Sequence, residues 1–477
     1  MAIISHDLFN EIIFEYYEIL NSKLFDYMLP TNKVGSTYDF LAFMEIISRE
    51  GEELIRKVLV KLLEKADLDF RKKPDRTSRY YVKQTRSRTI TTMYGDITYL
   101  RTEYVDRYDN KPYIYVDSKL GLNPKDRYAP DVKARIYAMY SDSKSMTDVG
   151  KNIGDIIEAK YHNGNPKDYA IPRQTVQRFL KEVRILSEDK KDIETLNIAL
   201  DEKWIHGQHN KDENGVNKDL MTKAALIFEN HLKADESKTN RPSYVGCTYY
   251  SSYQKDFKEE LIELIDSKYN LESIKTINVM ADGANWISEV VNNLKFPNTK
   301  LNKGLCPFHT GQALDRITRN KDIYKKAYEY LIHKDIKNFN KLIDSLIQNE
   351  PDKKDKINKA ADYLKTHIDE IITMKTVIKV PCAMEQAISH HLASQFTCVP
   401  KAYSPNNINY YTSNRDAYRN GYNMKLIYAK ARDLVTDDTN VVKINKQELD
   451  LSFFDKQSPL PYYEFKVNGN TQNFYMF

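Results

Sequence analysis

Residues 274–282 read Ile-Lys-Thr-Ile-Asn-Val-Met-Ala-Asp, a short apolar run that ends at an aspartate. A run of this length, rich in apolar and β-branched residues, predicts a buried strand. Amphipathic helical sequence precedes it at 257–265, and a second helical stretch follows at 283–294. A strand between helices predicts an α/β sheet, in which side chains at strand ends face a ligand crevice. We therefore expect Asp282 to lie at the mouth of such a crevice.

Further β runs surround this strand. Three runs joined by short turns come before it, and one more follows the next helix: 196–201, 223–228, 243–250 and 301–306. This order predicts a mixed α/β sheet over residues 191–320 and 381–400. Residues 321–380 interrupt it as a highly charged helical insertion, and a helix near 383–397 follows. Residues 401–477 form a Tyr-, Asn- and Lys-rich tail with weak structural signals.

The N-terminal part has a different character. Residues 1–70 are predicted to be helical, 71–117 a basic, Tyr-rich β unit with a turn at Gly95-Asp96, and 118–190 helical again. Residues 71–110 hold ten Lys or Arg against five acids. A solvated face and a phosphate-binding surface explain this charge equally well. The last helices, at 130–141, 145–158 and 172–185, could form a helix-turn-helix variant. The long gap from 159 to 171 favours ordinary packing instead.

Composition excludes several classes of protein. The 477 residues carry 72 Lys and Arg, 67 Asp and Glu and only four Cys, and 41% of them are hydrophobic. This composition excludes disorder throughout and a disulfide scaffold. Neither a signal peptide nor an apolar run of membrane-spanning length is evident, so we expect a cytoplasmic protein with no membrane partner. No Walker or dinucleotide glycine motif indicates a nucleotide cofactor, and no Gly-x-Ser-x-Gly elbow supports a hydrolase.

Three acids are candidates for chemistry. Asp201 follows an apolar strand run, Asp282 ends another, and Glu385 lies on the late helix. Glu385 shares its helix face with the apolar residues at +3, +7 and +11, namely Ile388, Leu392 and Phe396. An inward carboxylate is costly unless a positive group meets it, and a metal ion shared with the aspartates would do so. Carboxylate oxygens suit a pair of Mg²⁺ or Mn²⁺ ions. Periodicity alone does not separate these three from the other acids of the chain.

Neighbours of these acids have both structural and functional interpretations. Glu202 competes with Asp201, because only one of two adjacent strand residues faces a given side of the sheet. Trp204 and Trp286 follow the two aspartates, and we expect them to pack at the sheet edge, with base stacking as the secondary interpretation.

One group of residues has the ligand types of a zinc site. Cys306-Pro307-Phe308-His309, with Cys382 and His390-His391, contains only one short-spaced pair of ligands. Structural zinc sites usually have two such pairs. We therefore expect buried cysteines, and a polar contact from His309 to DNA or to an acid.

Arginines at three places are candidate DNA contacts. Arg86 and Arg88 lie in the basic unit, Arg173 and Arg178 in the following helices, and Arg415 and Arg419 at i,i+4 in the tail. A solvated surface explains the tail pair almost as well.

Four motifs occur in order: Asp201-Glu202-Lys203-Trp204-Ile205, Asp282-Gly283-Ala284-Asn285-Trp286-Ile287, Cys306–His309, and residues 385–394, Glu-Gln-Ala-Ile-Ser-His-His-Leu-Ala-Ser. Together with Arg86–Ile97 and Leu120-Gly121-Leu122, they resemble the Lre-type insertion-sequence transposases, a bacterial DDE family. The resemblance covers most of residues 40–425. This chain has Cys306 where family members tend to carry an acid, and Gln386 where a glycine often follows the catalytic glutamate.

The resemblance implies a ribonuclease-H-like catalytic domain with a helical insertion, and metal-dependent cutting and joining of DNA. Carried over by motif, it assigns catalysis and metal binding to Asp201, Asp282 and Glu385. Their neighbours His309, Trp286 and Glu202 are accessory candidates. It implies terminal repeats and target DNA as partners, a homodimer, and a place at the bacterial nucleoid. Two alternatives stay open: a catalytically silent DNA-binding derivative, and a nuclease of the same fold that cuts without joining.

Overall fold

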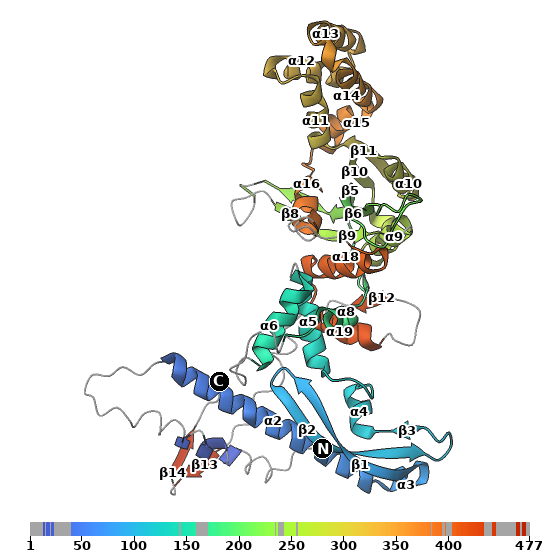
Figure 1. Cartoon of the computed structure of the whole chain (residues 1–477). Helices are drawn as coiled ribbons and strands as arrows, with labels where there is room; N and C mark the ends of the chain where they lie inside the picture. The colour runs from blue at the N-terminus through green and yellow to red at the C-terminus, as the bar shows by residue number, and fades with distance from the viewer. Residues whose placement is uncertain are drawn as a thin grey trace, which may run out of the picture. The chain divides into compact units, whose positions relative to one another are not determined.

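The computed structural model describes residues 13–14, 16–19, 21–22, 40–142, 145–158, 170–233, 235–236, 243–253, 256–382, 384–393, 396, 403–433, 441–444, 464–467 and 470–473. The chain divides into two compact units, Met1–Leu180 and Lys181–Phe477, whose elements are drawn in Figure 1. Much of the predicted helical region before residue 40, and Cys398, lie outside the described residues. Among the helices that the structure describes, none is both long and apolar enough to cross a membrane.

A long helix and a hairpin form the first unit. β1 (Tyr80–Thr92) and β2 (Gly95–Asp106) are antiparallel, β3 (Pro112–Tyr113) pairs with β2, and α2 (Phe40–Lys72) lies against the hairpin. The hairpin core contains Ile90, Ile97 and Tyr99, on which Leu59 and Leu63 of α2 pack. Met93 and Tyr94 form the turn, two residues earlier than predicted, because Gly95 adopts the left-handed φ of 102° and already pairs with Thr92.

Short helices complete the first unit. They are α3 (Pro74–Arg79), α4 (Tyr115–Leu120), α5 (Pro130–Asp142), α6 (Met146–Glu158) and α8 (Arg173–Phe179). α5 and α6 confirm the helices predicted at 130–141 and 145–158. The helix predicted at 172–185 is shorter, because the backbone becomes extended at Leu180 and residues 184–187 form a strand of the second unit. Of the predicted connection at 159–171, residues 159–169 lie outside the described residues.

A five-stranded mixed sheet forms the centre of the second unit. Its order is β11-β10-β5-β6-β9, from β5 (Thr195–Ile205), β6 (Leu220–Phe228), β9 (Thr248–Ser252), β10 (Thr276–Ala281) and β11 (Lys300–Leu305). β5, β6 and β9 are antiparallel neighbours, whereas β10 and β11 run parallel to β5. This confirms the predicted mixed α/β class. The run at 243–250 is divided at Gly246 into β9 and β8 (Ser243–Val245), and β8 pairs with β7 (Asn230–Leu232).

Alternation along the strands sorts side chains between two faces. Leu196, Ile198 and Leu200 of β5 pack in one apolar core with α9 (Phe257–Lys268) and α10 (Asn285–Asn293). The intervening residues, including Asn197 and Asp201, therefore face the other side of the sheet. α10 and the short η1 (Leu271–Ser273) lie in the connections on either side of β10.

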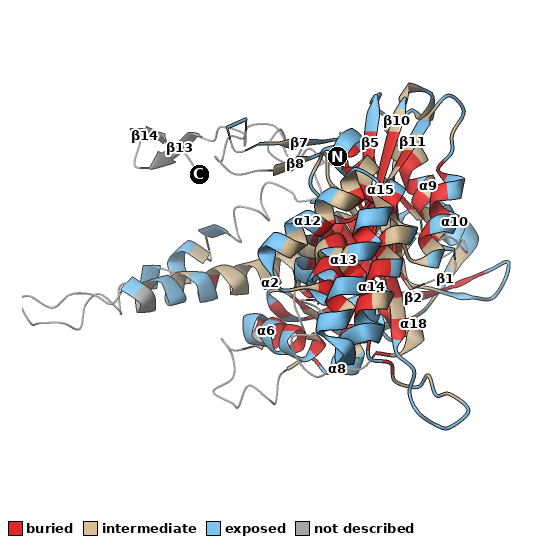
Figure 2. Cartoon of the chain, turned by 90° about the horizontal axis from the view of Figure 1, so that it is seen from above, coloured by how far each residue is buried: buried red, intermediate tan, exposed pale blue. Residues whose placement is uncertain are grey.

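The predicted insertion is helical and has its own core. It contains α12 (Lys321–Ile332), α13 (Ile336–Asn349), η2 (Pro351–Lys353), α14 (Lys354–Thr366), α15 (Ile368–Thr373) and the π-helical turn η3 (Met374–Ile378). α11 (Pro307–Ile317) lies before the predicted start at residue 321 but packs in the same core. Leu331, Phe339 and Leu364 are fully buried between these helices, and Figure 2 shows the buried stripes of α13 and α14. The glutamate segment follows as α16 (Met384–Ala387) and the π-helical turn η4 (Ile388–Ala393).

Residues 405–433, predicted only as part of a weakly structured tail, form α18 (Pro405–Arg419) and α19 (Met424–Asp433). α18 covers the outer edge of β9 with polar side chains. Asn409 and Asp416 of α18, and the Asn420 that caps it, accept hydrogen bonds from the backbone N–H groups of Tyr253, Ser251 and Tyr249 at 3.0, 2.6 and 2.7 Å. An uncovered edge strand would leave these groups unpaired. β12 (Val441–Ile444) pairs with β4 (Arg184–Ser187), and β13 (Glu464–Val467) with β14 (Asn470–Asn473).

Candidate functional site

Strand register places the two aspartates level with each other. β10 pairs with β5 in one unbroken parallel register that begins with Thr276 beside Thr195. Continuing that register to the end of β10 sets Asp282 beside Asp201. Asp201 lies inside a long strand rather than at its end, because β5 continues to Ile205 with β6 as its partner after β10 has ended.

Cys306 extends the same row to the third parallel strand. In β11, Leu305 lies beside Ala281, so the residue that follows Leu305 lies level with the one that follows Ala281. Cys306 therefore lies level with Asp282, and a thiol joins the two carboxylates in a row across the sheet.

A buried ladder of asparagines lies four residues before this row. Asn302 donates its Nδ2 hydrogen to Oδ1 of Asn278, and Asn278 donates in the same way to Asn197, both at 2.9 Å. Asn197 then donates to the backbone carbonyls of Phe228 and Glu229 at 3.4 and 3.3 Å. All three side chains are buried, so these bonds replace lost hydration and fix the relative register of β5, β10 and β11.

The acids converge into two groups that share Asp201. Ligand atoms of Asp201, His309 and Glu385 lie within 4.8 Å of one another, and so do those of Asp201, Glu202 and Asp282. His309 Nε2 is 3.4 Å from Glu385 Oε1. Ile388, Leu392 and Phe396 are buried as predicted, whereas the Glu385 side chain is 35% exposed. The single helix predicted at 383–397 is divided into α16 and the π-helical turn η4. The positive partner that an inward Glu385 requires is, in the protein itself, the His309 imidazole.

Burial and like charge shift the protonation of this cluster. Burial chiefly raises the pKa of Asp201 to about 7, with further increases from Glu385 and Asp282, although Glu202 N–H and His309 oppose them. The pKa of Glu385 is also raised, first by burial and then by Cys306 and Asp282. Burial lowers the pKa of His309, but Cys306 and the carboxylates of Asp201 and Glu385 outweigh it, and the net shift is upward. Burial and mutual repulsion thus make the ionised carboxylates costly, and His309 offsets only part of that cost.

Both strand neighbours, Asp201 and Glu202, bring oxygens to the site, whereas the sequence predicts only one. Glu202 belongs to the apolar-core face, where its Oε2 accepts a 2.8 Å hydrogen bond from Trp286 Nε1. Its side chain still comes near Asp282 because β10 ends at Ala281 and leaves the space beside β5 open. Trp286 packs edge-to-face on Phe257, as predicted for a sheet-edge residue. Trp204 is 57% exposed and does not belong to this core.

Cys306 links the row of acids to the insertion. It is buried immediately before α11, whose first turn carries His309. Contact with Cys382, followed by His309 and the α11 backbone amides, lowers the pKa of the Cys306 thiol despite burial. The predicted polar contact from His309 is made to Glu385.

The candidate DNA-binding arginines divide into exposed and buried groups. Arg86, Arg173, Arg178 and Arg419 are exposed. Arg88 contradicts the sequence prediction, because it is 6% exposed and its guanidinium contacts Asp117 at 2.5 Å and the carbonyls of Asn123 and Asp126 at 2.8 Å. Arg415 is likewise only 6% exposed. Both therefore belong to the interior and not to a DNA-binding face.

Sequence reasoning missed two groups of residues near the site. The asparagine ladder could have been found in the sequence. Asn197, Asn278 and Asn302 stand four residues before Asp201, Asp282 and Cys306. The second group is His391 with Asp416, which joins the glutamate segment to α18. The Ser-His-His string gives a partial signal for His391, whereas nothing near Asp416 distinguishes it from the other acids.

Comparison with known proteins places the chain in a family. The pattern that defines the uncharacterised protein family UPF0236 matches residues 37–431. UPF0236 protein TTE2489 of Caldanaerobacter subterraneus subsp. tengcongensis is 23% identical over 399 residues, which cover 80% of this chain and 79% of the relative. A second UPF0236 protein of that organism, whose name joins eleven locus designations from TTE0033 to TTE2212, is 22% identical over 435 residues, covering 85% of this chain and 86% of the relative. Because the family pattern spans most of its length, the chain belongs to the UPF0236 family.

Proposed function

We propose that this chain is a DNA transposase that cuts and joins DNA at the ends of an insertion sequence, with Asp201, Asp282 and Glu385 as its catalytic residues. The convergence of these acids from β5, the end of β10 and α16 carries the proposal. The three acids come from distant parts of the chain. Even so, Asp282 and Glu385 each have a carboxylate oxygen within 4.8 Å of one on Asp201.

The donor set fits divalent metal ions. It is rich in carboxylate oxygen, which Mg²⁺ and Mn²⁺ prefer. Burial, with Glu385 and Asp282 adding to it, raises the pKa of Asp201, and a cation bound beside this carboxylate would offset the cost of its ionised form. Asp201 would be shared between two positions, one with Asp282 and Glu202 and one with Glu385 and His309. Ions bound there would supply Lewis-acid activation of the attacking oxygen and stabilise the leaving oxygen in a displacement at phosphorus. The chain's residues would hold the reacting phosphate in line, and Trp286 would keep Glu202 oriented toward Asp282.

The topology supports a ribonuclease-H-like catalytic domain. Three antiparallel strands, β5, β6 and β9, are followed by two strands that cross over through helices and lie parallel to β5. Asp282 directly follows the end of β10, at the edge where α/β sheets bind ligands, and Asp201 lies level with it inside β5. The helices 307–378 enter between the second aspartate and the glutamate, as the resemblance to Lre-type transposases implies.

A cationic surface of the first unit is suited to DNA. Exposed cations gather around α3 and the β2–β3 turn: Lys72, Lys73, Arg79, Arg107 and Lys111. The guanidinium groups of Arg79 and Arg107 lie over the rings of Tyr80 and Tyr81, with centroid distances of 5.2 and 5.6 Å. Nε of Arg79 donates to Asp106 at 2.8 Å and Nε of Arg107 to the Thr77 carbonyl at 3.3 Å, so the terminal N–H groups of these two restricted side chains would meet the phosphates. We assign DNA contact to this end of the unit instead of to Arg88.

The names of the relatives also support a mobile element. One UPF0236 relative is assigned to eleven loci and another to four. One protein encoded at many loci of a genome is the pattern expected when its gene is copied from place to place. A dimer that brings two element ends together, acting at the nucleoid, belongs to this proposal.

Cleavage of DNA that contains the element ends tests the proposal. Full-length protein is incubated with a linear duplex carrying its gene and the flanking DNA, in Mn²⁺ or in EDTA, and cuts are mapped by sequencing. We expect cuts at the ends in Mn²⁺, none in EDTA and none with Asp282→Asn. The matched control Asp266→Asn, at an exposed carboxylate paired with Lys190, should leave cutting unchanged. Cutting by Asp282→Asn at the wild-type rate would contradict the assignment.

Two outcomes would identify the alternatives. DNA binding without metal-dependent cutting would indicate a silent regulatory derivative. Cutting without insertion of pre-cut ends into a target plasmid would indicate a nuclease of the same fold.

A further inference from the structure

The segment that carries Glu385 is short and lies between two irregular turns. α16 has only four residues, and the π-helical turn η4 follows it directly. A helix of this length does not hold its own position, because helix formation by so few residues is unfavourable without tertiary contacts. Apolar contacts from Ile388 and Leu392 press the segment onto the sheet, yet they are not directional. The placement of the Glu385 carboxylate therefore depends on directional contacts elsewhere in the segment.

His391 makes the directional contact. Its imidazole is 4% exposed and lies 4.8 Å from the ring of Tyr249, nearly parallel to it at 23°. Its Nε2 is 2.5 Å from Asp416 Oδ1 on α18. The imidazole is thus held on one side by a strand residue and on the other by a carboxylate, six residues after Glu385.

Asp416 is itself firmly fixed. Its Oδ2 accepts the backbone N–H of Ser251 at 2.6 Å, and the Ser251 hydroxyl donates to Oδ1 at 2.9 Å. The neighbouring bonds from Tyr253 to Asn409 and from Tyr249 to Asn420 hold α18 against β9 on both sides of Asp416. Asp416 therefore connects the sheet edge, α18 and the glutamate segment through one buried carboxylate.

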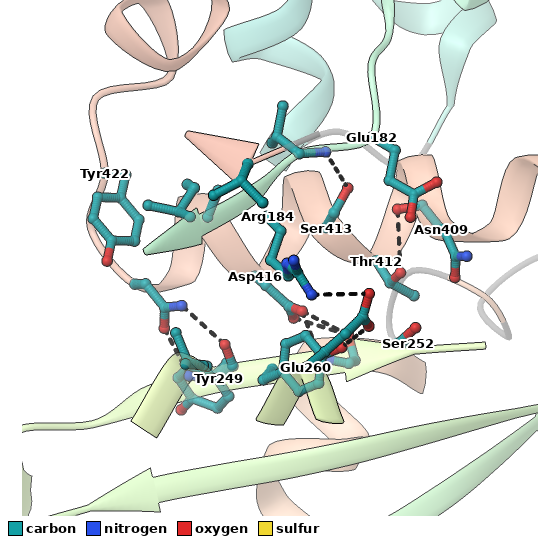
Figure 3. A pocket seen from close by; sticks show the side chains of 18 residues that line it. Glu182, Arg184, Tyr249, Ser252, Glu260, Asn409, Thr412, Ser413, Asp416 and Tyr422 are labelled. Atoms are coloured by element: carbon teal, nitrogen blue, oxygen red, sulfur yellow. Dashed lines mark hydrogen bonds and ion pairs between the residues drawn. The ribbon is translucent and has the colours of Figure 1, made fainter. Parts of the chain in front are cut away.

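A cavity lined by both polar and apolar side chains borders this carboxylate. Figure 3 shows Asp416 on the wall of a pocket of about 250 Å³, near Tyr249, Ser252, Glu260 and Thr412. Arg184 in the same pocket is paired with Glu260 at 3.3 Å and Glu263 at 2.9 Å. A change at Asp416 can thus be accommodated by water without collapse of the apolar core. It would loosen His391 more than it would unfold the sheet.

We propose that Asp416 is a positioning residue, which acts through His391 to fix the helical turn that presents Glu385 to Asp201 and His309. This inference rests on the proposed function, in which Glu385 helps to hold a divalent cation. Residues that orient metal ligands without touching the metal commonly change metal affinity by about 10–100-fold when mutated. The C-terminal helix α18 is on this view part of the active site.

The test measures Mn²⁺ binding to the metal-free full-length chain by electron paramagnetic resonance, together with its melting temperature. Asp416→Asn should raise the half-saturating Mn²⁺ concentration about tenfold or more. Asp67→Asn is the matched control, because buried Asp67 of α2 also accepts the backbone N–H and the hydroxyl of one strand residue, Thr102. Both variants should melt earlier, but only Asp416→Asn should weaken Mn²⁺ binding. An equal shift in the two variants, or none in Asp416→Asn, would overturn the proposal.

A double variant adds a second, independent measurement. Asp416→Asn combined with His391→Gln replaces the charged contact with a neutral amide pair, and should recover part of the Mn²⁺ affinity lost in Asp416→Asn. Strictly additive losses would show that the two residues do not act as a pair. Asp201→Asn should abolish Mn²⁺ binding. If Asp201→Asn binds Mn²⁺ as the wild type does, or the wild type binds none, the proposed function fails and this inference fails with it. If Asp201→Asn loses Mn²⁺ binding but Asp416→Asn keeps the wild-type affinity, only the positioning role fails.

Discussion

Removal of the central acid should make the metal-free protein more stable. Asp201 has its pKa raised from 3.8 to about 7, chiefly by burial. At about 1.36 kcal/mol per pKa unit, keeping this group ionised in the folded state costs at most roughly 4 kcal/mol. Asp201→Asn removes the charge but keeps Oδ1, which accepts the 2.8 Å hydrogen bond from Glu202 N–H. We therefore expect the variant to be more stable at pH 8 by up to about 4 kcal/mol.

The sign of the pH dependence follows from proton linkage. Below pH 3.8 both states carry the proton and the cost is absent. As the pH rises from 3.8 to about 7, the unfolded chain releases the proton while the folded chain retains it, so wild-type stability falls. Above pH 7 the cost is fully present. The advantage of Asp201→Asn should thus be smaller at pH 5, at roughly 2 kcal/mol. It should vanish below pH 3.8.

Urea unfolding in EDTA at pH 5 and pH 8 measures this difference, and it is then repeated with Mn²⁺. Mn²⁺ should stabilise the wild type by binding only its folded state, and should leave Asp201→Asn unchanged. Asp67→Asn serves as the contrasting control, since loss of its bonds to Thr102 should destabilise the protein by about 1–3 kcal/mol. If Asp201→Asn is no more stable than wild type in EDTA at pH 8, the claim that the buried, ionised Asp201 carboxylate destabilises the folded protein is refuted.

Two further predictions concern the sheet and the DNA surface. Asn278→Leu should lower the free energy of unfolding by about 2–4 kcal/mol, because it removes the donor to Asn197 Oδ1 and the acceptor for Asn302 Nδ2. Exposed Asn293→Leu should change the free energy of unfolding little in the same urea titration. Replacement of Lys72, Lys73 and Arg107 by Gln should reduce the slope of log K against log salt for duplex binding in EDTA by about 2–3, at roughly 0.9 per lost phosphate contact. Replacement of Lys321, Lys325 and Lys337, exposed on the helical insertion, is the matched control, and an equal reduction there would argue against the assigned surface.

The core strands could be predicted because their signals are local. Residues 196–200 and 276–281 are apolar runs bounded by polar residues, and burial on both faces of a sheet requires such runs. The position of Glu385 could also be predicted, since Ile388 and Leu392 mark its helix face. The sequence does not show which residues of two neighbouring strands pair with each other. The position of Asp282 beside Asp201 therefore became known only from the register of β10 with β5.

Arg88 and α18 show why the remainder could not be predicted. The partner of Arg88 is Asp117, 29 residues away, and no local pattern distinguishes a paired buried arginine from an exposed one. The α18 region contacts the β9 edge through Asn409, Asp416 and Asn420 rather than through an apolar stripe. A search for hydrophobic periodicity therefore does not detect this helix. Polar side chains that satisfy backbone groups have no signature until the backbone they satisfy is known.

The asparagine ladder explains how a fold can tolerate a row of mutually repelling acids. Asn197 and Asn278 each lie four residues before an aspartate, and four residues along a strand return to the same face. The ladder and the acids therefore share one face and one register. Repulsion between Asp201 and Asp282 favours displacement of β10 along β5, and a slip of a single residue would turn Asp282 to the opposite face. Such a slip would also leave buried amides unpaired, at about 1–3 kcal/mol for each group. The amide bonds thus oppose the repulsion directly, and they keep the carboxylates together when no cation is present to neutralise them.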